Sequence, residues 1–274
     1  MNDGWSVGVV VPARDEADRI AACVSSLRAS LWASLGDGSC GEARIVVVAD
    51  RCRDATATVA RGPLGLLDEV VEVDYGNVGA ARRRGTDGLL ELLGYGGRAA
   101  AKRTWLLTTD ADTVVPVDWV AAHLRLAEAG AAGVAGVIRI DTFADHAEHA
   151  DAVRRRFDVT YAIHPDGTHP HVHGANLGVR ADAYLAVGGW PTLATAEDHA
   201  LWARLRSDGW PTVSSIEAWV TTSGRRVGRA PLGFAACLAD LAPAVGHSNV
   251  LVELVENDAP DQHVRPRRLA PAGS

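Results

Sequence analysis

The stretch TWLLTTDADTVV, residues 104–115, decides the fold. It opens with an apolar run that has no polar face and ends in Asp110 and Asp112, which one residue separates. Runs that are apolar on both faces are typical of strands in a parallel sheet covered by helices on both sides. Ligands bind such sheets just beyond the carboxyl ends of the strands. The stretch therefore predicts a buried strand that brings two carboxylates to a site.

Further strands and helices alternate along the first 130 residues. The runs SVGVVVP (6–12) and ARIVVVAD (43–50) repeat the apolar pattern, and VVEVDY (70–75) fits another strand. Between them, residues 15–35 and 80–93 carry apolar side chains every three or four positions, as amphipathic helices do. This alternation predicts an α/β fold with a mostly parallel central sheet flanked by helices.

The second half of the chain is less regular and predicts a smaller α+β extension of the same domain. Two strands and two helices are expected, at 134–140, 175–180, 145–161 and 197–207, with a loop rich in His, Pro and Gly at 164–176. We expect one domain over residues 1–256. Residues 257–274 contain too few apolar side chains to pack, so they predict a flexible tail. The apolar segment 231–242 fits either a helix over the core or a homodimer contact.

Composition narrows the classes of partner. The chain of 274 residues has a formal net charge of -7, which disfavours nucleic acid as a partner. No apolar stretch approaches the roughly 18 residues that cross a membrane, and the N-terminus lacks a signal-peptide pattern, so we expect a cytoplasmic protein. Its four cysteines show no C-x-x-C spacing, which argues against a disulfide framework or a thiolate zinc site.

The aspartate pair has two interpretations. Side chains two residues apart in extended chain point the same way, so both carboxylates repel each other unless a cation lies nearby. Oxygen ligands favour a hard divalent ion, Mg²⁺ or Mn²⁺, which keeps positions open for substrate phosphate. Alternatively, the pair is a solvated turn in which Asp112 caps the helix that follows Pro116.

Six stretches resemble, in order, the family 2 glycosyltransferases of GT-A fold. They are VVVPARDEADRI (9–20), VVVADRCRDAT (46–56), GNVGAARRRG (76–85), WLLTTDADTVVPVDWV (105–120), NLGVRADAYLAVGGW (176–190) and ATAEDHALWARLRSDGW (194–210). The resemblance implies a nucleotide-binding half over about residues 1–130 and an acceptor half over about 131–256. It also implies a donor of the UDP- or GDP-sugar type, a hydroxyl-bearing acceptor, and Mn²⁺ or Mg²⁺ as cofactor.

The resemblance also implies roles for donor-side residues. Pro12, Ala13 and Glu16 are expected to line the nucleotide pocket, with Glu16 near the ribose or base. Asp50 is expected to accept a hydrogen bond from the base imide, although it also fits a turn cap for residues 52–57. Asp15 stands where the family usually has Asn.

The segment after the third predicted strand carries a further pair of donor-side residues. Gly79 is expected to let the backbone approach the ligand, and Arg82 to fork onto a phosphate or base oxygen. Asp110 is assigned to the donor and Asp112 to the metal.

Acceptor-side roles follow from the last two stretches. Asp198 matches the family's general base, which removes the acceptor proton during an inverting transfer. Gly189 and Trp190 match a glycine–aromatic element near the acceptor sugar, and Glu197 is assigned to the same side. Two alternatives stay open: Glu197 and Asp198 also suit the first turn of a helix, and Trp190 also suits the core.

Two features depart from the family pattern. Where many members have a histidine after the last core strand, this chain has VTTSGRRVGRAP (220–231), so Arg225, Arg226 or Arg229 is a candidate for the diphosphate and the third metal ligand is in doubt. The histidines at 164, 169, 171 and 173 fit either a zinc site or an acceptor-binding loop. A nucleotidyltransferase and a non-catalytic nucleotide-sugar-binding protein are the competing functions.

Overall fold

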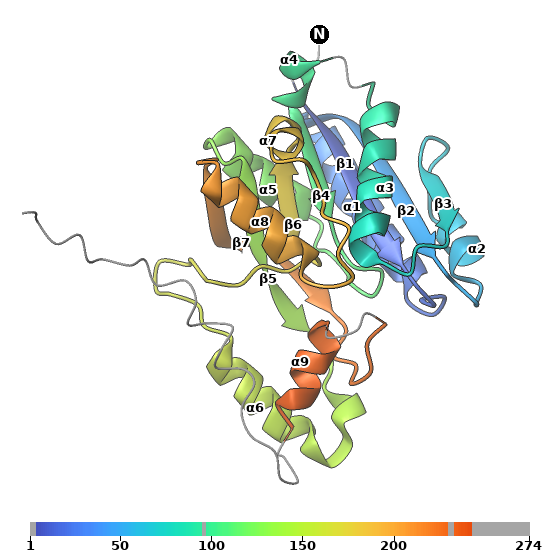
Figure 1. Ribbon diagram of the computed structural model, residues 1–274, viewed down its shortest axis with the longest axis vertical. Helices are drawn as coiled ribbons and strands as arrows, with labels where there is room; N and C mark the ends of the chain where they lie inside the picture. Colours follow the sequence, from blue (N-terminus) through green and yellow to red (C-terminus); the bar gives the residue numbers. More distant parts are fainter. Residues whose placement is uncertain (1–3, 95–96, 230–232, 243–274) are drawn as a thin grey trace, which may run out of the picture.

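A seven-stranded sheet forms the centre of the molecule in the computed structural model, which describes residues 4–94, 97–229 and 233–242 (Figure 1). The strand order is β3-β2-β1-β4-β6-β5-β7, and among these strands β6 alone runs antiparallel to its neighbours. The strands are β1 (Trp5–Ala13), β2 (Cys40–Asp50), β3 (Glu69–Val73), β4 (Thr104–Thr108), β5 (Gly133–Ile140), β6 (Leu177–Arg180) and β7 (Thr212–Thr222). The mostly parallel sheet expected from the sequence is confirmed.

Helices cover both faces of this sheet. One face packs against α1 and α5, and the other packs against α3, α7 and α8. The helices are α1 (Ile20–Gly36), α2 (Thr56–Arg61), α3 (Val78–Leu92), α4 (Arg98–Ala101), α5 (Trp119–Glu128), α6 (Ala150–Thr160), α7 (Ala181–Ala186), α8 (Glu197–Ser207) and α9 (Phe234–Asp240), with a 3-10 helix η1 (Ala144–His149). No helix in the described ranges is both long and apolar enough to cross a bilayer.

The apolar runs have no polar face because each strand meets helices on both sides. In β1, Val7, Val9 and Val11 join the core under α1 and α5, whereas Val10 joins the core under α3. Helix α3 lies so close that a Cβ on Gly85 would come within 2.4 Å of a methyl group of Val10. Glycine at 85 therefore sets the distance between α3 and the sheet.

One element of the second half differs from expectation, and one open alternative is decided. The helix expected at 145–161 is divided into η1 and α6, because Ala147 has a non-helical backbone (φ 48°, ψ −125°). The segment expected to be either a helix or a dimer contact forms α9, whose Leu238 packs with Phe143 and Val153 in a small separate core. Helices α6 and α9 lie side by side beyond one end of the sheet (Figure 1). Residues 231–232 and 243–274, including the expected tail, lie outside the described residues.

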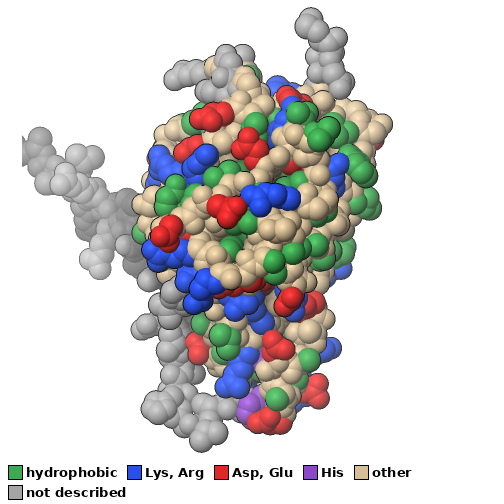
Figure 2. All heavy atoms as spheres, turned by 90° about the vertical axis from the view of Figure 1, so that its right-hand side faces the viewer, with side chains coloured by type: hydrophobic (Ala, Val, Ile, Leu, Met, Phe, Trp, Pro, Cys, Tyr) green, Lys and Arg blue, Asp and Glu red, His purple; other side chains and the backbone are tan. Residues whose placement is uncertain are grey.

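The surface carries mixed charge on the face turned toward the viewer in Figure 2, where Lys or Arg side chains lie among Asp and Glu. This face is the right-hand side of Figure 1, where α2 and β3 lie. The excess of acidic residues in the chain therefore forms no continuous negative patch on this face.

The buried side chain of Asn176 closes an irregularity in the pairing of β5 with β7. Its Nδ2 donates to the carbonyl oxygens of Val137 (2.9 Å) and Ala218 (3.0 Å). Its Oδ1 accepts from Nε1 of Trp119 at 2.8 Å and lies 3.2 Å from Nε2 of His123. Asn176 thus joins both strands to α5 and leaves none of these polar groups unsatisfied.

Replacing Asn176 with Ala is expected to lower the free energy of unfolding by about 3 kcal/mol, since several buried polar groups lose their partner at once. Asn77→Ala is the matched control. Asn77 caps α3 by accepting from the N–H of Ala80 (2.9 Å), and loss of a cap costs about 1 kcal/mol. Urea unfolding followed by circular dichroism measures both, and equal losses would contradict the role assigned to Asn176.

Candidate active site

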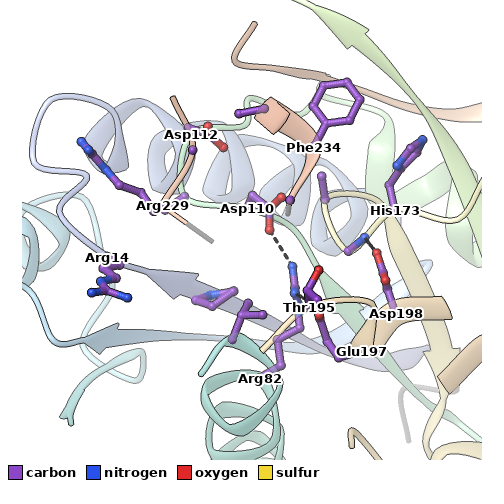
Figure 3. Close-up of a pocket in the computed structure, with 18 of the residues that line it drawn as sticks. Arg14, Arg82, Asp110, Asp112, His173, Thr195, Glu197, Asp198, Arg229 and Phe234 are labelled. Atoms are coloured by element: carbon purple, nitrogen blue, oxygen red, sulfur yellow. Dashed lines mark hydrogen bonds and ion pairs between the residues drawn. The ribbon is translucent and has the colours of Figure 1, made fainter. Parts of the chain in front are cut away.

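A cavity of about 520 Å³ opens at the carboxyl ends of β1, β2 and β4 and extends to the start of α8 (Figure 3). Its walls come from segments far apart in the sequence, as expected at this edge of an α/β sheet. Nine of the twelve site residues expected from the sequence line it: Pro12, Ala13, Glu16, Asp50, Arg82, Asp110, Asp112, Glu197 and Asp198.

The other three, Gly79, Gly189 and Trp190, are not part of its lining. A Cβ on Gly79 would lie 2.2 Å from the carbonyl oxygen of Pro191, so packing against that loop explains the glycine. Gly189 occupies a turn with φ +70°. Trp190 is only 4% exposed and sits in the core, which agrees with the core alternative and leaves no face free for a sugar.

Arg82, on α3, lies between two acidic side chains of the cavity wall, Asp110 and Glu197. Its side chain is 2% exposed; Nε donates to Thr108 Oγ1 (3.0 Å), and its two terminal nitrogens donate to Asp110 and Glu197. The guanidinium also lies 5.5 Å from the ring of Trp190. The expected role of Arg82 as a fork for a ligand oxygen is therefore not the one seen here, because all three of its nitrogens bind protein groups.

Asp50, the last residue of β2, lines the cavity beside the end of β1. Its carboxylate accepts from the backbone N–H groups of residues 75–77 at 2.7–2.9 Å and so holds the loop before α3. The alternative turn cap for residues 52–57 is supplied by Asp54 instead, which accepts from the N–H of Thr56 (3.0 Å). Asp15, in place of the family's Asn, has a left-handed backbone (φ 52°), which Asn and Asp tolerate better than most residues.

Arg225 is inserted between two acidic residues at the opposite wall. It comes from the loop after β7, and its guanidinium donates to Glu16 (2.6 Å) and to Asp112. The pKa of Asp112 is raised to about 6, chiefly by burial; the charge of Arg225 opposes this rise, whereas the charges of Asp110 and Glu16 add to it. Of the three arginine candidates for the diphosphate, Arg225 and Arg229 line the cavity, and Arg226 is exposed outside it.

The side chains present do not form a site for Mn²⁺ or Mg²⁺ as arranged. Within the described ranges, no three His, Cys, Asp or Glu side chains are grouped to hold a metal ion. Asp110 and Asp112 each have an arginine partner, Arg82 and Arg225. Asp112 lies where the sequence analysis expects it, but its partner is a guanidinium, so a divalent ion could bind there only if Arg225 moved away.

Asp198 is held at the far end of the cavity by the backbone (Figure 3). Its carboxylate accepts from the N–H of Gly174 (2.6 Å) and from that of His199 (2.8 Å). His173 lies beside it with Nε2 enclosed and without a hydrogen-bond partner among the described residues. Enclosure of the ring lowers the pKa of His173 to about 3, so the imidazole is neutral.

The remaining histidines of the 164–176 loop do not converge on one point. The rings of His169, His171 and His173 lie in a row with centroids 5.8 and 6.0 Å apart, and Tyr161 stacks on His171 at 4.0 Å. His164 is exposed. Rings stacked in a row do not converge on a central ion as the ligands of a tetrahedral zinc site do, and of the three only His173 lines the cavity. The sequence analysis overlooked Phe234, which also lines the cavity, because no motif marks it.

Comparisons with known proteins bear on the fold and the family of this chain. A model of the family described as "Glycosyltransferase like family 2" matches residues 4–230. Similar solved structures include the mannosyltransferase PcManGT from Pyrobaculum calidifontis in complex with GDP-Man and Mn²⁺, with a TM-score of 0.54 and 20% identity over 86% of this chain and 68% of that one. No curated protein matches.

Two further structures are similar at 13% identity. GalNAc-T7 with UDP, GalNAc and Mn²⁺ has a TM-score of 0.58 over 81% of this chain and 44% of its own, and S. aureus TarS has a TM-score of 0.56 over 80% of this chain and 36% of its own. This chain thus spans less than half of either protein. Likeness at such identities shows the fold, and the family match covers most of the chain. The chain therefore belongs to the family 2 glycosyltransferases, enzymes of GT-A fold.

Proposed function

We propose that this enzyme transfers a sugar from a nucleoside-diphosphate donor to an acceptor hydroxyl with inversion, and that Asp198 is the general base. The observation that carries the proposal is the division of one cavity into two ends. Arg14 and Arg229 lie at one end, Asp198 and His173 lie at the other, and Asp110 lies between them (Figure 3).

The acceptor end suits proton removal. An attacking hydroxyl must lose its proton as it bonds to C1 of the sugar, and a carboxylate within hydrogen-bond reach can take it. The two backbone N–H groups that bind Asp198 fix its orientation and leave each carboxylate oxygen a further lone pair. Direct displacement by the attacking hydroxyl needs no covalent intermediate.

The donor end suits a base with an imide N–H. Asp50 uses three acceptor positions on backbone N–H groups, and a carboxylate has about four. The remaining position supports recognition of uracil or guanine, beside the walls formed by Pro12 and Ala13. Glu16 pairs with Arg225. We therefore place Glu16 near the diphosphate of the donor rather than near its ribose or base.

The departing diphosphate gains negative charge, which needs a cation. Mn²⁺ or Mg²⁺ is the cofactor that the family resemblance implies, and PcManGT and GalNAc-T7 were solved with Mn²⁺. We assign no step to a metal ion, because the carboxylates that would hold it are paired with arginines. A cytoplasmic location and a homodimer stay predictions.

The competing functions are weaker on specific grounds. A nucleotidyltransferase typically relies on a glycine-rich basic loop over a triphosphate, whereas RDEADR (14–19), which contains no glycine, follows β1 here. A non-catalytic nucleotide-sugar-binding protein needs the donor end alone and has no use for a base at Asp198.

Asp198→Asn tests the base. Nucleoside-diphosphate release from the sugar nucleotide, with water as acceptor, is expected to fall about 10²–10⁴-fold, because the amide cannot accept the proton. Donor binding, measured by calorimetry, is expected to stay unchanged. Asp208→Asn, at the exposed end of the same helix, is the control and keeps full turnover. Full turnover in Asp198→Asn would defeat the assignment.

A panel of nucleoside diphosphates tests the donor end. UDP or GDP is expected to raise the melting temperature, since a ligand that binds only the native state stabilises it. ADP is expected to have no comparable effect, because adenine offers no imide N–H to Asp50. Differential scanning fluorimetry at matched concentrations measures the shifts. An equal shift with ADP contradicts base reading by Asp50.

Arg82→Met tests the link between the two ends. It is expected to lower the free energy of unfolding by about 3–5 kcal/mol, because it leaves the buried carboxylate of Glu197 unpaired. Adding Glu197→Gln is expected to restore part of that loss, and the double-mutant cycle gives the coupling. Arg84→Met, on the same helix, should cost less than about 1 kcal/mol. Additive losses would show that the pair is not coupled.

A further inference from the structure

We propose that Arg225 is the resident cation of the diphosphate end, and that nucleoside diphosphates bind this enzyme through Arg225 without a divalent ion. The inference rests on the proposed function, because it concerns the donor of that reaction. It starts from the contact of one guanidinium with both Asp112 and Glu16, at the place where the family resemblance implies a metal.

Arg225 is held in place by two buried acidic side chains. Its side chain is 17% exposed, and those of its partners Glu16 and Asp112 are 6% and 9% exposed. The partners lie 209 and 113 residues away in sequence, after β1 and β4. Both bonds use one terminal nitrogen of Arg225. Its Nε and other terminal nitrogen donate to no side chain in the part of the chain that the structure describes, so they remain available at the cavity wall.

The charges of the cavity require such a group. Three carboxylates, those of Glu16, Asp110 and Asp112, lie at the strand ends and would repel a diphosphate. The charge of Arg82 is taken up by Asp110 and Glu197. Arg225 is the cation nearest the remaining acids, and a guanidinium binds phosphate oxygens in a bidentate fork.

A divalent ion and Arg225 compete for the same oxygens. A metal bound by Asp112 would lie against the guanidinium that now contacts this carboxylate, and two cations at that distance repel each other. Removal of the Arg225 charge therefore has opposite effects on two ligands: it weakens diphosphate binding and strengthens Mn²⁺ binding. A purely structural role for Arg225 predicts no gain in Mn²⁺ affinity.

The test is calorimetric titration of UDP and GDP into wild type, Arg225→Gln, Arg225→Lys and Arg226→Gln, each in EDTA and in Mn²⁺. Wild type is expected to bind one of the two diphosphates in EDTA. Arg225→Gln is expected to bind it at least about tenfold more weakly there, equivalent to about 1.4 kcal/mol. Arg225→Lys should keep part of the affinity, and the exposed Arg226→Gln should equal wild type. Electron paramagnetic resonance titration of Mn²⁺ alone is expected to show tighter binding to Arg225→Gln.

Two results overturn the inference and leave the proposed function standing: diphosphate binding by wild type in Mn²⁺ but not in EDTA, or unchanged binding by Arg225→Gln in EDTA. Absence of binding by either diphosphate under both conditions overturns the proposed donor class together with the inference. If Arg225→Gln does not fold, the wild-type comparison of EDTA with Mn²⁺ still tests binding without a divalent ion, and Arg225→Lys, expected to bind more weakly than wild type in EDTA, tests the part played by Arg225.

Discussion

The buried guanidinium of Arg82 is the interaction on which the site depends. It joins Asp110, just beyond β4, to Glu197, the first residue of α8, and so couples the edge of the sheet to that helix. Carrying this charge out of water is costly, and the two carboxylates and Thr108 offset much of that cost. The start of α8, which carries Asp198, is therefore fixed relative to the sheet by electrostatics as much as by packing.

The two aspartates of TTDADT have different partners although one residue separates them. Asp110 pairs with Arg82 of α3, and Asp112 pairs with Arg225 from the loop after β7. The repulsion expected between such carboxylates is thus relieved by two cations of the chain itself. A divalent ion was expected from the sequence at this pair, whereas the structure pairs each carboxylate with an arginine of the chain.

Much of the fold could be predicted because its signals are local. The apolar runs 6–12, 43–50 and 104–110 mark strands β1, β2 and β4, since covered parallel strands have no polar face. The place of β6 could not be predicted. It has four residues and lies antiparallel between β4 and β5, and neither its partners nor its direction has a local signature. The break at Ala147 is similarly invisible, because alanine favours helix.

The same distinction between local signals and long-range contacts applies to the site residues. Motifs located nine of the lining residues, because a residue after a strand points to the ligand edge whatever its partner. The motifs do not predict that Gly79 makes room for the carbonyl oxygen of Pro191. They also do not predict that Arg82 and Arg225 bind carboxylates. Each of these contacts is made with a segment over a hundred residues away in the sequence. A site in which four acids, Glu16, Asp110, Asp112 and Glu197, are already paired with the chain's own arginines keeps its shape without ligand. A charged ligand that enters the site must therefore compete with these ion pairs for the arginines and the carboxylates.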